Sequence, residues 1–363
     1  MFRSPRLALL PNLLLLVASL ASAACVGDEP PPRDVDLAIY AGEAMGLAAV
    51  SAELDLLAEM RTVAQVALPS REVQSAALGE LLRAAADRGV EVRLWPLLPE
   101  ADGYWPNENN IDKYAQLVRD ILARLRRDDL VASAIVYDME PAFEYSEKLF
   151  AATDGGDLGT ALRLLQQHVD RKAFAAAREK LVASVREVQA QGLRAACVTF
   201  PQVLDDVADG DNDVEDAFDI PVRDVPWDNV SLMVYQSVYA SLAGGWIGPA
   251  LVQSYAADAR ATFGDAATIA LGLVGQAGVL TPEGRPRYPD AQTLADDVGA
   301  ALAAGVKRVE LFSFDGMLES GRAKAREWLA AAAAAKAKPV DGVSSRVKRV
   351  RGIISALDDL LDK

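Results

Sequence analysis

Between residues 35 and 335, apolar strand-like runs alternate with amphipathic helical stretches, and this alternation limits the fold more than any other feature. The expected strands are Asp36–Tyr40, Val63–Leu68, Val90–Leu97, Val131–Met139, Leu193–Thr199, Val230–Tyr235, Thr268–Val274 and Val306–Phe314. The expected helices lie around Leu47–Met60, Arg71–Arg88, Ile111–Arg127, Phe143–Gln191 (broken near Gly155–Gly156), Pro249–Phe263, Ala291–Ala304 and Ser320–Ala335. Strands joined through helices pair in parallel. Eight such strands predict an α/β fold, a single closed (β/α)8 TIM barrel.

The alternative is an open doubly wound sheet. That fold commonly carries G-x-G-x-x-G after its first strand, and no such run follows here. Residues 336–363 lie beyond the last unit and predict a linker and an amphipathic C-terminal helix. We expect this helix to pack against the barrel, although its basic start also suits a membrane surface.

The first 24 residues have the composition of a signal peptide. Arg3 and Arg6 form a basic start, and an apolar run follows from Leu7 to Leu20, too short for a comfortable membrane span. Small residues then lead to Cys25, which resembles a bacterial lipobox and predicts lipidation of Cys25, followed by a linker to residue 34. Ala21-Ser22-Ala23 also fits an ordinary cleavage site, so simple secretion stays open. Both alternatives place the protein outside the cytoplasm, and lipidation would anchor it to a membrane.

The charge and composition of the chain exclude several classes of binding partner and catalytic site. The chain has 363 residues and a net charge of -15, which disfavours nucleic acid and anionic lipid as electrostatic partners. With one histidine, His168, a His-based zinc site or a Ser-His-Asp triad is hard to build. We expect no metal and no cofactor. Cys197 lies in an apolar run and is expected to be buried. Nothing in the sequence indicates the oligomeric state.

Two carboxylates end the fourth expected strand. Side chains alternate along a strand, so Val136, Asp138 and Glu140 share one face. If that face is the barrel interior, both acids lie at the carboxyl end of the barrel, where TIM-barrel active sites are found. Neighbouring carboxylates cannot both ionise easily, so one is expected to stay protonated. A protonated carboxyl is what a general acid for glycosidic cleavage requires.

Three strand ends resemble motifs of glycoside hydrolase family 18, the chitinase and endo-N-acetylglucosaminidase family. YDMEP, residues 137–141, is similar to the end of that family's D-x-x-D-x-D-x-E signature, and MVYQ, residues 233–236, to its M-x-Y-D. GVKRVELFSFDG, residues 305–316, is similar to G-V-x-x-V-x-x-W-x-x-D. The resemblance spans about residues 35–330 and keeps these motifs in part.

The resemblance implies a role for each matched residue. Glu140 would protonate the leaving oxygen, while Asp138 and Tyr235 would orient the substrate's own acetamido group as the nucleophile. Gln236, Phe312 and Asp315 stand at substrate-binding positions. The departures are Ser133 and Val136 at the first two signature acids, Gln236 in place of Asp and Phe312 in place of Trp.

Other residues near the strand ends are also candidates for the site or for a metal. Trp95 and Trp105 are expected to stack against sugar rings at the barrel mouth, with ordinary loop packing as the alternative. Glu310 is expected to be either a buried paired carboxylate or a further site residue. Asp209, Asp211 and Asp213 resemble a calcium loop, but Val214 stands where Gly is required, so a solvated acidic loop is favoured.

The sequence therefore predicts an exported glycoside hydrolase-like barrel acting on a neutral or N-acetylated glycan. The alternative is a catalytically inactive barrel that binds glycan or a protein partner. A different family of glycan-cleaving barrels with similar strand ends is a third reading.

Overall fold

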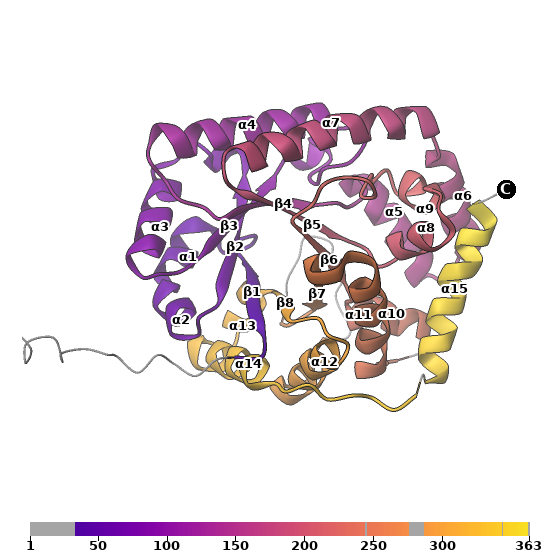
Figure 1. Ribbon diagram of the computed structural model, residues 1–363. Helices are drawn as coiled ribbons and strands as arrows, with labels where there is room; N and C mark the ends of the chain where they lie inside the picture. The colour runs from indigo at the N-terminus through magenta and orange to yellow at the C-terminus, as the bar shows by residue number, and fades with distance from the viewer. Residues whose placement is uncertain (1–32, 244, 276–286, 343, 362–363) are drawn as a thin grey trace, which may run out of the picture. The chain divides into compact units, whose positions relative to one another are not determined.

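Eight parallel strands close into one barrel in the computed structural model, which describes residues 33–243, 245–275, 287–342 and 344–361 (Figure 1). Each strand pairs with its neighbours in sequence, and the ring closes where Leu37 of β1 pairs with Val309 of β8. The strands are β1 Asp36–Ala41, β2 Val63–Pro69, β3 Val92–Leu97, β4 Ala134–Asp138, β5 Arg194–Thr199, β6 Asn229–Met233, β7 Ala267–Gly272 and β8 Arg308–Phe312. The predicted (β/α)8 barrel is confirmed.

By its internal contacts the chain divides into residues 1–33 and residues 34–363. The predicted signal peptide and Cys25 lie outside the described residues.

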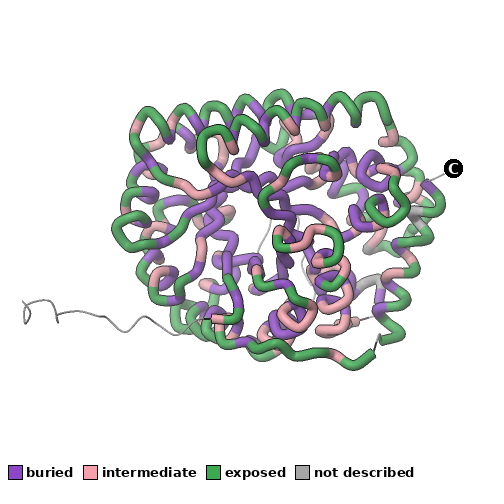
Figure 2. Tube along the Cα trace, viewed as in Figure 1, coloured by how far each residue is buried: buried purple, intermediate pink, exposed green. Residues whose placement is uncertain are grey.

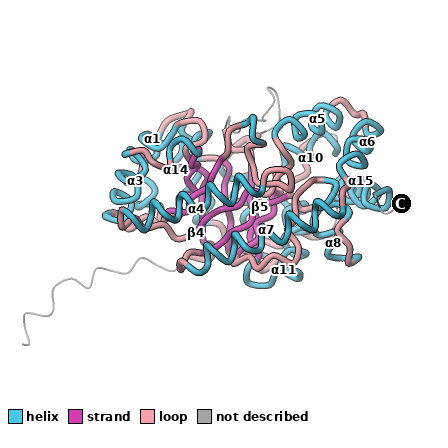
Figure 3. The backbone as a smooth tube through the Cα atoms, turned by 90° about the horizontal axis from the view of Figure 1, so that it is seen from above, coloured by secondary structure: helices cyan, strands magenta, loops and turns pink. Residues whose placement is uncertain are grey.

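The helices form a ring around the strands (Figure 3). They are α1 Gly46–Ala52, α2 Leu54–Glu59, α3 Ala76–Asp87, α4 Ile111–Arg127, α5 Phe143–Asp154, α6 Leu158–His168, α7 Arg171–Ala190, α8 Val203–Asp209, α9 Asp213–Ala217, α10 Gln236–Ala243, α11 Pro249–Phe263, α12 Ala291–Ala303, α13 Phe314–Leu318, α14 Arg322–Ala334 and α15 Ser345–Leu361. Short 3-10 turns occupy η1 Ser70–Glu72, η2 Glu100–Asp102 and η3 Gly264–Ala266.

Helix boundaries differ from the sequence prediction where local capping decides them. The predicted helix 143–191 breaks near Gly155, as expected, and breaks again before Asp170, whose side chain caps α7 by accepting from the Lys172 and Ala173 amides. The predicted helix 71–88 begins only at Ala76, because Ser75 caps it by accepting from the Leu78 amide. The acidic segment 205–216 is not a plain loop, since it forms α8 and α9.

Apolar side chains fill two layers of the barrel. The larger layer lies between the strands and the helices, where α4 contributes Tyr114, Val118 and Ile121 at helical spacing. The smaller layer fills the barrel interior and includes Tyr40 and Trp95. Figure 2 shows the consequence, with buried strands at the centre and helices exposed on their outer faces.

One side of the barrel carries additional helices. There α5, α6, α9 and α15 gather beyond the ends of β4 to β6, and α15 contacts α10, α9 and α6 (Figure 1). The predicted C-terminal helix therefore packs against the side of the barrel. Among the described residues, no helix is both long and apolar enough to cross a membrane.

Candidate active site

A pocket lies at the carboxyl ends of the strands, and its wall comes from most of the barrel. We call it the acid pocket, after its three carboxyl residues. It is lined by Tyr40, Glu43, Trp95, Trp105, Asp138, Glu140, Phe150, Val198, Phe200, Met233, Tyr235, Val238, Leu273 and Phe312. Six of the eight predicted catalytic and substrate-binding residues meet here: Glu140, Asp138, Tyr235, Phe312, Trp95 and Trp105.

The strand alternation in β4 explains why the two acids reach the pocket. Val136 belongs to the apolar layer inside the barrel, whereas Tyr137 packs outward against the helices. Asp138 therefore points inward, where it is 4% exposed, and Glu140 follows on the same face and is half-buried. The expectation that this face is the barrel interior is correct.

The Asp138–Glu140 pair holds a proton more tightly than free carboxyls do. Burial raises the pKa of Asp138 well above its usual range, and the Glu43 carboxylate raises it further. Burial also raises the pKa of Glu140, followed by the charges of Asp138 and Glu43. The contact between the pair lowers the pKa of Asp138 and raises that of Glu140. Both pKa values are therefore raised, and the two protons leave in separate steps that belong to the pair as a whole.

Glu43 is a third carboxyl in the pocket, and the sequence analysis did not identify it. It follows β1, and its Oε1 accepts a hydrogen bond from the Tyr104 hydroxyl at 3.0 Å. Burial and, to a smaller extent, the charge of Asp315 raise the pKa of Glu43 to about 7, against the opposing effect of that hydrogen bond. The signal for Glu43 was its place after a strand, the same criterion that identified Glu140.

Aromatic rings form much of the pocket wall. Tyr40 meets Trp95 edge to face with ring centroids 5.1 Å apart, and Phe312 lies 6.3 Å from Trp95. Tyr235 stacks on Phe312 at 5.8 Å with an interplanar angle of 26°. Burial and the Asp138 charge hold the pKa of Tyr235 well above its usual range, so its hydroxyl stays a neutral donor. Such surfaces suit the apolar faces of sugar rings.

Three buried polar atoms of pocket residues lack a well-formed hydrogen bond with the part of the chain that is described. They are Nε1 of Trp95, Nε1 of Trp105 and Oδ1 of Asp138, although Trp95 lies close enough to Asp138 to lower the pKa of that carboxyl. Buried polar groups in folded proteins nearly always find a partner, and leaving one without costs about 1–3 kcal/mol. A ligand with both acceptors and donors would satisfy all three atoms.

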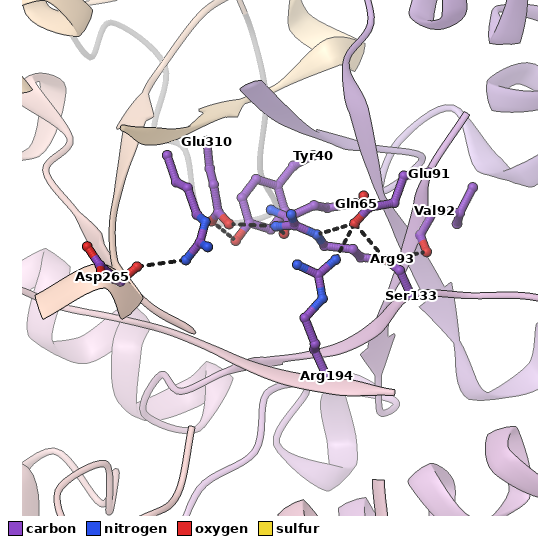
Figure 4. Close-up of polar contacts among 10 residues, drawn as sticks. Tyr40, Gln65, Glu91, Val92, Arg93, Ser133, Arg194, Asp265 and Glu310 are labelled. Atoms are coloured by element: carbon purple, nitrogen blue, oxygen red, sulfur yellow. Dashed lines mark hydrogen bonds and ion pairs between the residues drawn. The ribbon is translucent and has the colours of Figure 1, made fainter. Parts of the chain in front are cut away.

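A polar layer supports the pocket from inside the barrel. Oε2 of Glu310 accepts from the Tyr40 hydroxyl at 3.0 Å, and its Oε1 lies 3.5 Å from the Arg93 guanidinium, which also reaches Gln65 at 3.4 Å (Figure 4). Of the two expectations for Glu310, the buried paired carboxylate is the correct one. Glu310 holds Tyr40, which is itself a pocket residue that sequence reasoning missed.

Two predicted substrate-binding residues lie away from the acid pocket. Gln236 begins α10, where it is fully buried, donates to Asp297 at 3.0 Å and accepts from the Gly248 amide. Asp315 lies in α13 and accepts from the backbone amides of Gly42, Ala44 and Met45. Asp315 therefore fixes the loop that carries Glu43.

The acidic segment behaves as a folded unit. Arg171 pairs with Asp213 at 3.0 Å, and Asp209 and Asp211 accept from backbone amides two residues onward. Among the described residues, no group of three or more His, Cys, Asp or Glu side chains is arranged to hold a metal ion.

Cys197 is buried, as expected. His168 is half-buried and bonds to Asp219 through Nδ1 at 2.9 Å.

Comparisons with known proteins do not assign this chain to a family. No family model and no curated protein matches the sequence. Among solved structures, D-allulose 3-epimerase from Methylomonas sp. is 11% identical with a TM-score of 0.45, covering 90% of this chain and 99% of its own. A xylose isomerase domain protein from Alicyclobacillus acidocaldarius is 13% identical with a TM-score of 0.40, covering 90% and 99%.

The catalytic domain of a hyperthermophilic chitinase from Pyrococcus furiosus is also similar. It is 10% identical with a TM-score of 0.43, covering 90% of this chain and 97% of its own. These proteins differ in the activities that their names give. The barrel of this chain is shown by its own strand pairing, and a barrel fold does not by itself determine an activity.

Proposed function

We propose that this protein is an exported glycoside hydrolase that cleaves a glycosidic bond in an N-acetylated or otherwise neutral glycan. The observation that carries the proposal is the Asp138–Glu140 pair in the acid pocket, where burial and the nearby charge of Glu43 raise the pKa of both carboxyls. A carboxyl that keeps its proton at neutral pH serves as a general acid. The aromatic wall and the unpartnered polar atoms support a sugar as the ligand.

Each residue has a role in the proposed reaction. Glu140 donates its proton to the leaving oxygen as the bond to the anomeric carbon breaks. The substrate's acetamido oxygen attacks that carbon, while the Asp138 carboxylate and the Tyr235 hydroxyl hold the acetamido group. Water then attacks the same carbon and returns a proton to Glu140.

Substitution of Glu140 tests the proposal. Glu140→Gln keeps size and hydrogen bonding but cannot act as the acid, so fluorophore release from N-acetylglucosaminides should fall on the order of 10²–10⁴-fold. Asp138→Asn should also impair turnover. The matched control is Glu144→Gln, since the Glu144 side chain is 81% exposed four residues further along. If Glu140→Gln keeps the activity of the wild type, Glu140 is not the general acid.

The rival is a catalytically silent barrel that binds glycan or a protein partner. Val136 favours it, because this interior position carries a carboxylate in the family that the sequence resembles. No release from a panel of glycosides by the wild-type protein, with glycan binding retained, would support the rival.

Export and anchoring are a separate part of the proposal, motivated by the residues before Cys25. The wild-type protein should incorporate labelled fatty acid and partition into detergent, and Cys25→Ser should do neither. Equal labelling of both proteins would refute the anchor. Secretion without labelling would favour the ordinary cleavage site.

A further inference from the structure

A second pocket adjoins the acid pocket, and the proposed hydrolysis leaves it unexplained. We call it the apolar annex. The two pockets share part of their lining, namely Phe150, Phe200, Met233, Tyr235 and Val238. The annex also includes Pro141, which directly follows Glu140. A ligand in the acid pocket can therefore continue into the annex beside the proposed general acid.

The annex is built by the additional helices on one side of the barrel. Leu149 comes from α5, Leu165 from α6, and Ile353, Ile354 and Leu361 from α15. No residue of its lining carries a charge. The Ser146 hydroxyl donates to the Pro141 carbonyl at 3.1 Å, and the Thr153 hydroxyl donates to the Leu149 carbonyl at 3.0 Å. Both hydroxyl protons are therefore already used within the protein. Gln202 Oε1 is the polar atom of the lining that lacks a partner within the described residues.

The two pockets differ in chemistry. The annex has a cavity volume of about 150 Å³ against about 80 Å³ for the acid pocket, and it is the apolar one. The unpartnered Trp95, Trp105 and Asp138 atoms all belong to the acid pocket. A ligand that satisfies both pockets has a polar head with hydrogen-bonding groups and an apolar chain attached to it.

We propose that the substrate is a glycolipid, with its sugar in the acid pocket and its hydrocarbon chain in the apolar annex. This inference rests on the proposed glycosidase function, for which it names the substrate class. The hydrocarbon chain is attached on the aglycone side, because Pro141 lines the annex and directly follows the acid that protonates the leaving oxygen. Burying each methylene of the chain should strengthen binding on the order of two- to fourfold.

The test uses the full-length protein and a series of N-acetylglucosaminides with methyl, butyl, hexyl and octyl aglycones, each kept below its micelle concentration. Binding is followed by tryptophan fluorescence and turnover by release of the sugar. The inference expects affinity to rise with each methylene. Equal affinity for the methyl and octyl glycosides would overturn it.

A matched pair of variants locates the effect. Ile353 is half-buried in the annex, and Ile353→Glu should flatten the dependence of binding on chain length. Leu360 lies on the same helix, is 39% exposed and does not line the annex, so Leu360→Glu should keep the wild-type dependence. The same dependence in both variants would place the chain elsewhere and overturn the inference.

The two proposals fail in distinguishable ways. Chain-length-dependent binding that Ile353→Glu removes, without sugar release from any member of the series, supports the amphipathic ligand and refutes the hydrolysis. Sugar release that depends on Glu140 but not on chain length supports the hydrolysis and refutes the glycolipid.

Discussion

The Tyr104 hydroxyl donates a hydrogen bond of 3.0 Å to Glu43, and this contact joins the segment after β3 to the segment after β1 at the edge of the acid pocket. It keeps Glu43 beside Asp138 and Glu140, whose pKa values the Glu43 charge raises. Glu43 thus tunes the proposed acid without being matched to any motif.

Glu43→Gln should therefore move the basic limb of the pH–activity profile to lower pH. Removing the Glu43 charge lowers the pKa of Glu140, so the acid loses its proton at a lower pH. The basic limb of kcat/KM reports that ionisation in the free enzyme. Glu43→Asp keeps the charge and should leave the limb closer to its wild-type position. A limb that stays in place in Glu43→Gln, or moves upward, would contradict this role.

A second prediction concerns the polar layer below the pocket. Glu310 is 2% exposed and has Arg93 as its ionic partner. Arg93→Met should cost about 3–5 kcal/mol of unfolding free energy, because it leaves a buried carboxylate without a counter-charge. In the double variant Arg93→Met/Glu310→Gln that charge is gone, so part of the loss should return. Denaturant unfolding of the wild type, Arg93→Met, Glu310→Gln and the double variant measures the coupling, and strictly additive losses would show that the pair does not interact.

The alternation rules predicted the barrel and the inward face of β4. Periods of two and of 3.6 residues located the strands and most helices, and period two placed Asp138 and Glu140 on the interior. These patterns are local consequences of burial, which is why the sequence carries them.

Other parts of the site depend on contacts between distant segments. Gln236 follows a strand motif, yet the chain turns into α10 there and Asp297, 61 residues later, binds its amide. The apolar annex forms only because α15 returns to pack on α6, α9 and α10. Glu43 could have been predicted, because it follows the first strand, but it belongs to no motif in the sequence.

A third prediction concerns pH and stability. Burial raises the pKa of Asp206 to about 8 and that of Glu215 to about 7, although backbone amides donate to both carboxyls. A carboxyl whose folded-state pKa is raised binds more protons folded than unfolded. Stability is therefore fully present below the unfolded value near 4 and falls as pH rises toward about 8.

Thermal unfolding between pH 5 and pH 8.5 checks this. The midpoint temperature should decrease across the range. Each of the two carboxyls lowers the free energy of unfolding by at most about 1.4 kcal/mol per pH unit. In Asp206→Asn one titrating carboxyl is absent, so the decrease should be shallower, whatever the absolute midpoint. A wild-type midpoint that is flat or rises with pH would show that these acids ionise normally in the folded protein.

The last prediction concerns the packing of the segment after β7 on α13. A Cβ built on Gly316 would lie 2.1 Å from the Val274 carbonyl oxygen, and one built on Gly275 would lie 2.0 Å from the Gly316 carbonyl oxygen. Both obstacles are backbone atoms, which cannot rotate away as a side chain can. Gly316→Ala should therefore destabilise the protein by about 3 kcal/mol or more, since the two segments must separate.

Gly352 provides the control for Gly316→Ala. It lies inside α15, its φ is not positive, and no atom lies within 4 Å of a Cβ built there. Alanine lowers the entropy cost of ordering a helix, so Gly352→Ala should raise the unfolding free energy by about 0.5–1 kcal/mol. Denaturant unfolding of the two variants should thus give shifts of opposite sign. Gly316 follows Asp315, which holds the Glu43 loop, so Gly316→Ala should also lower turnover. If Gly316→Ala has the stability of the wild type, the two segments can separate at no cost and the prediction is wrong.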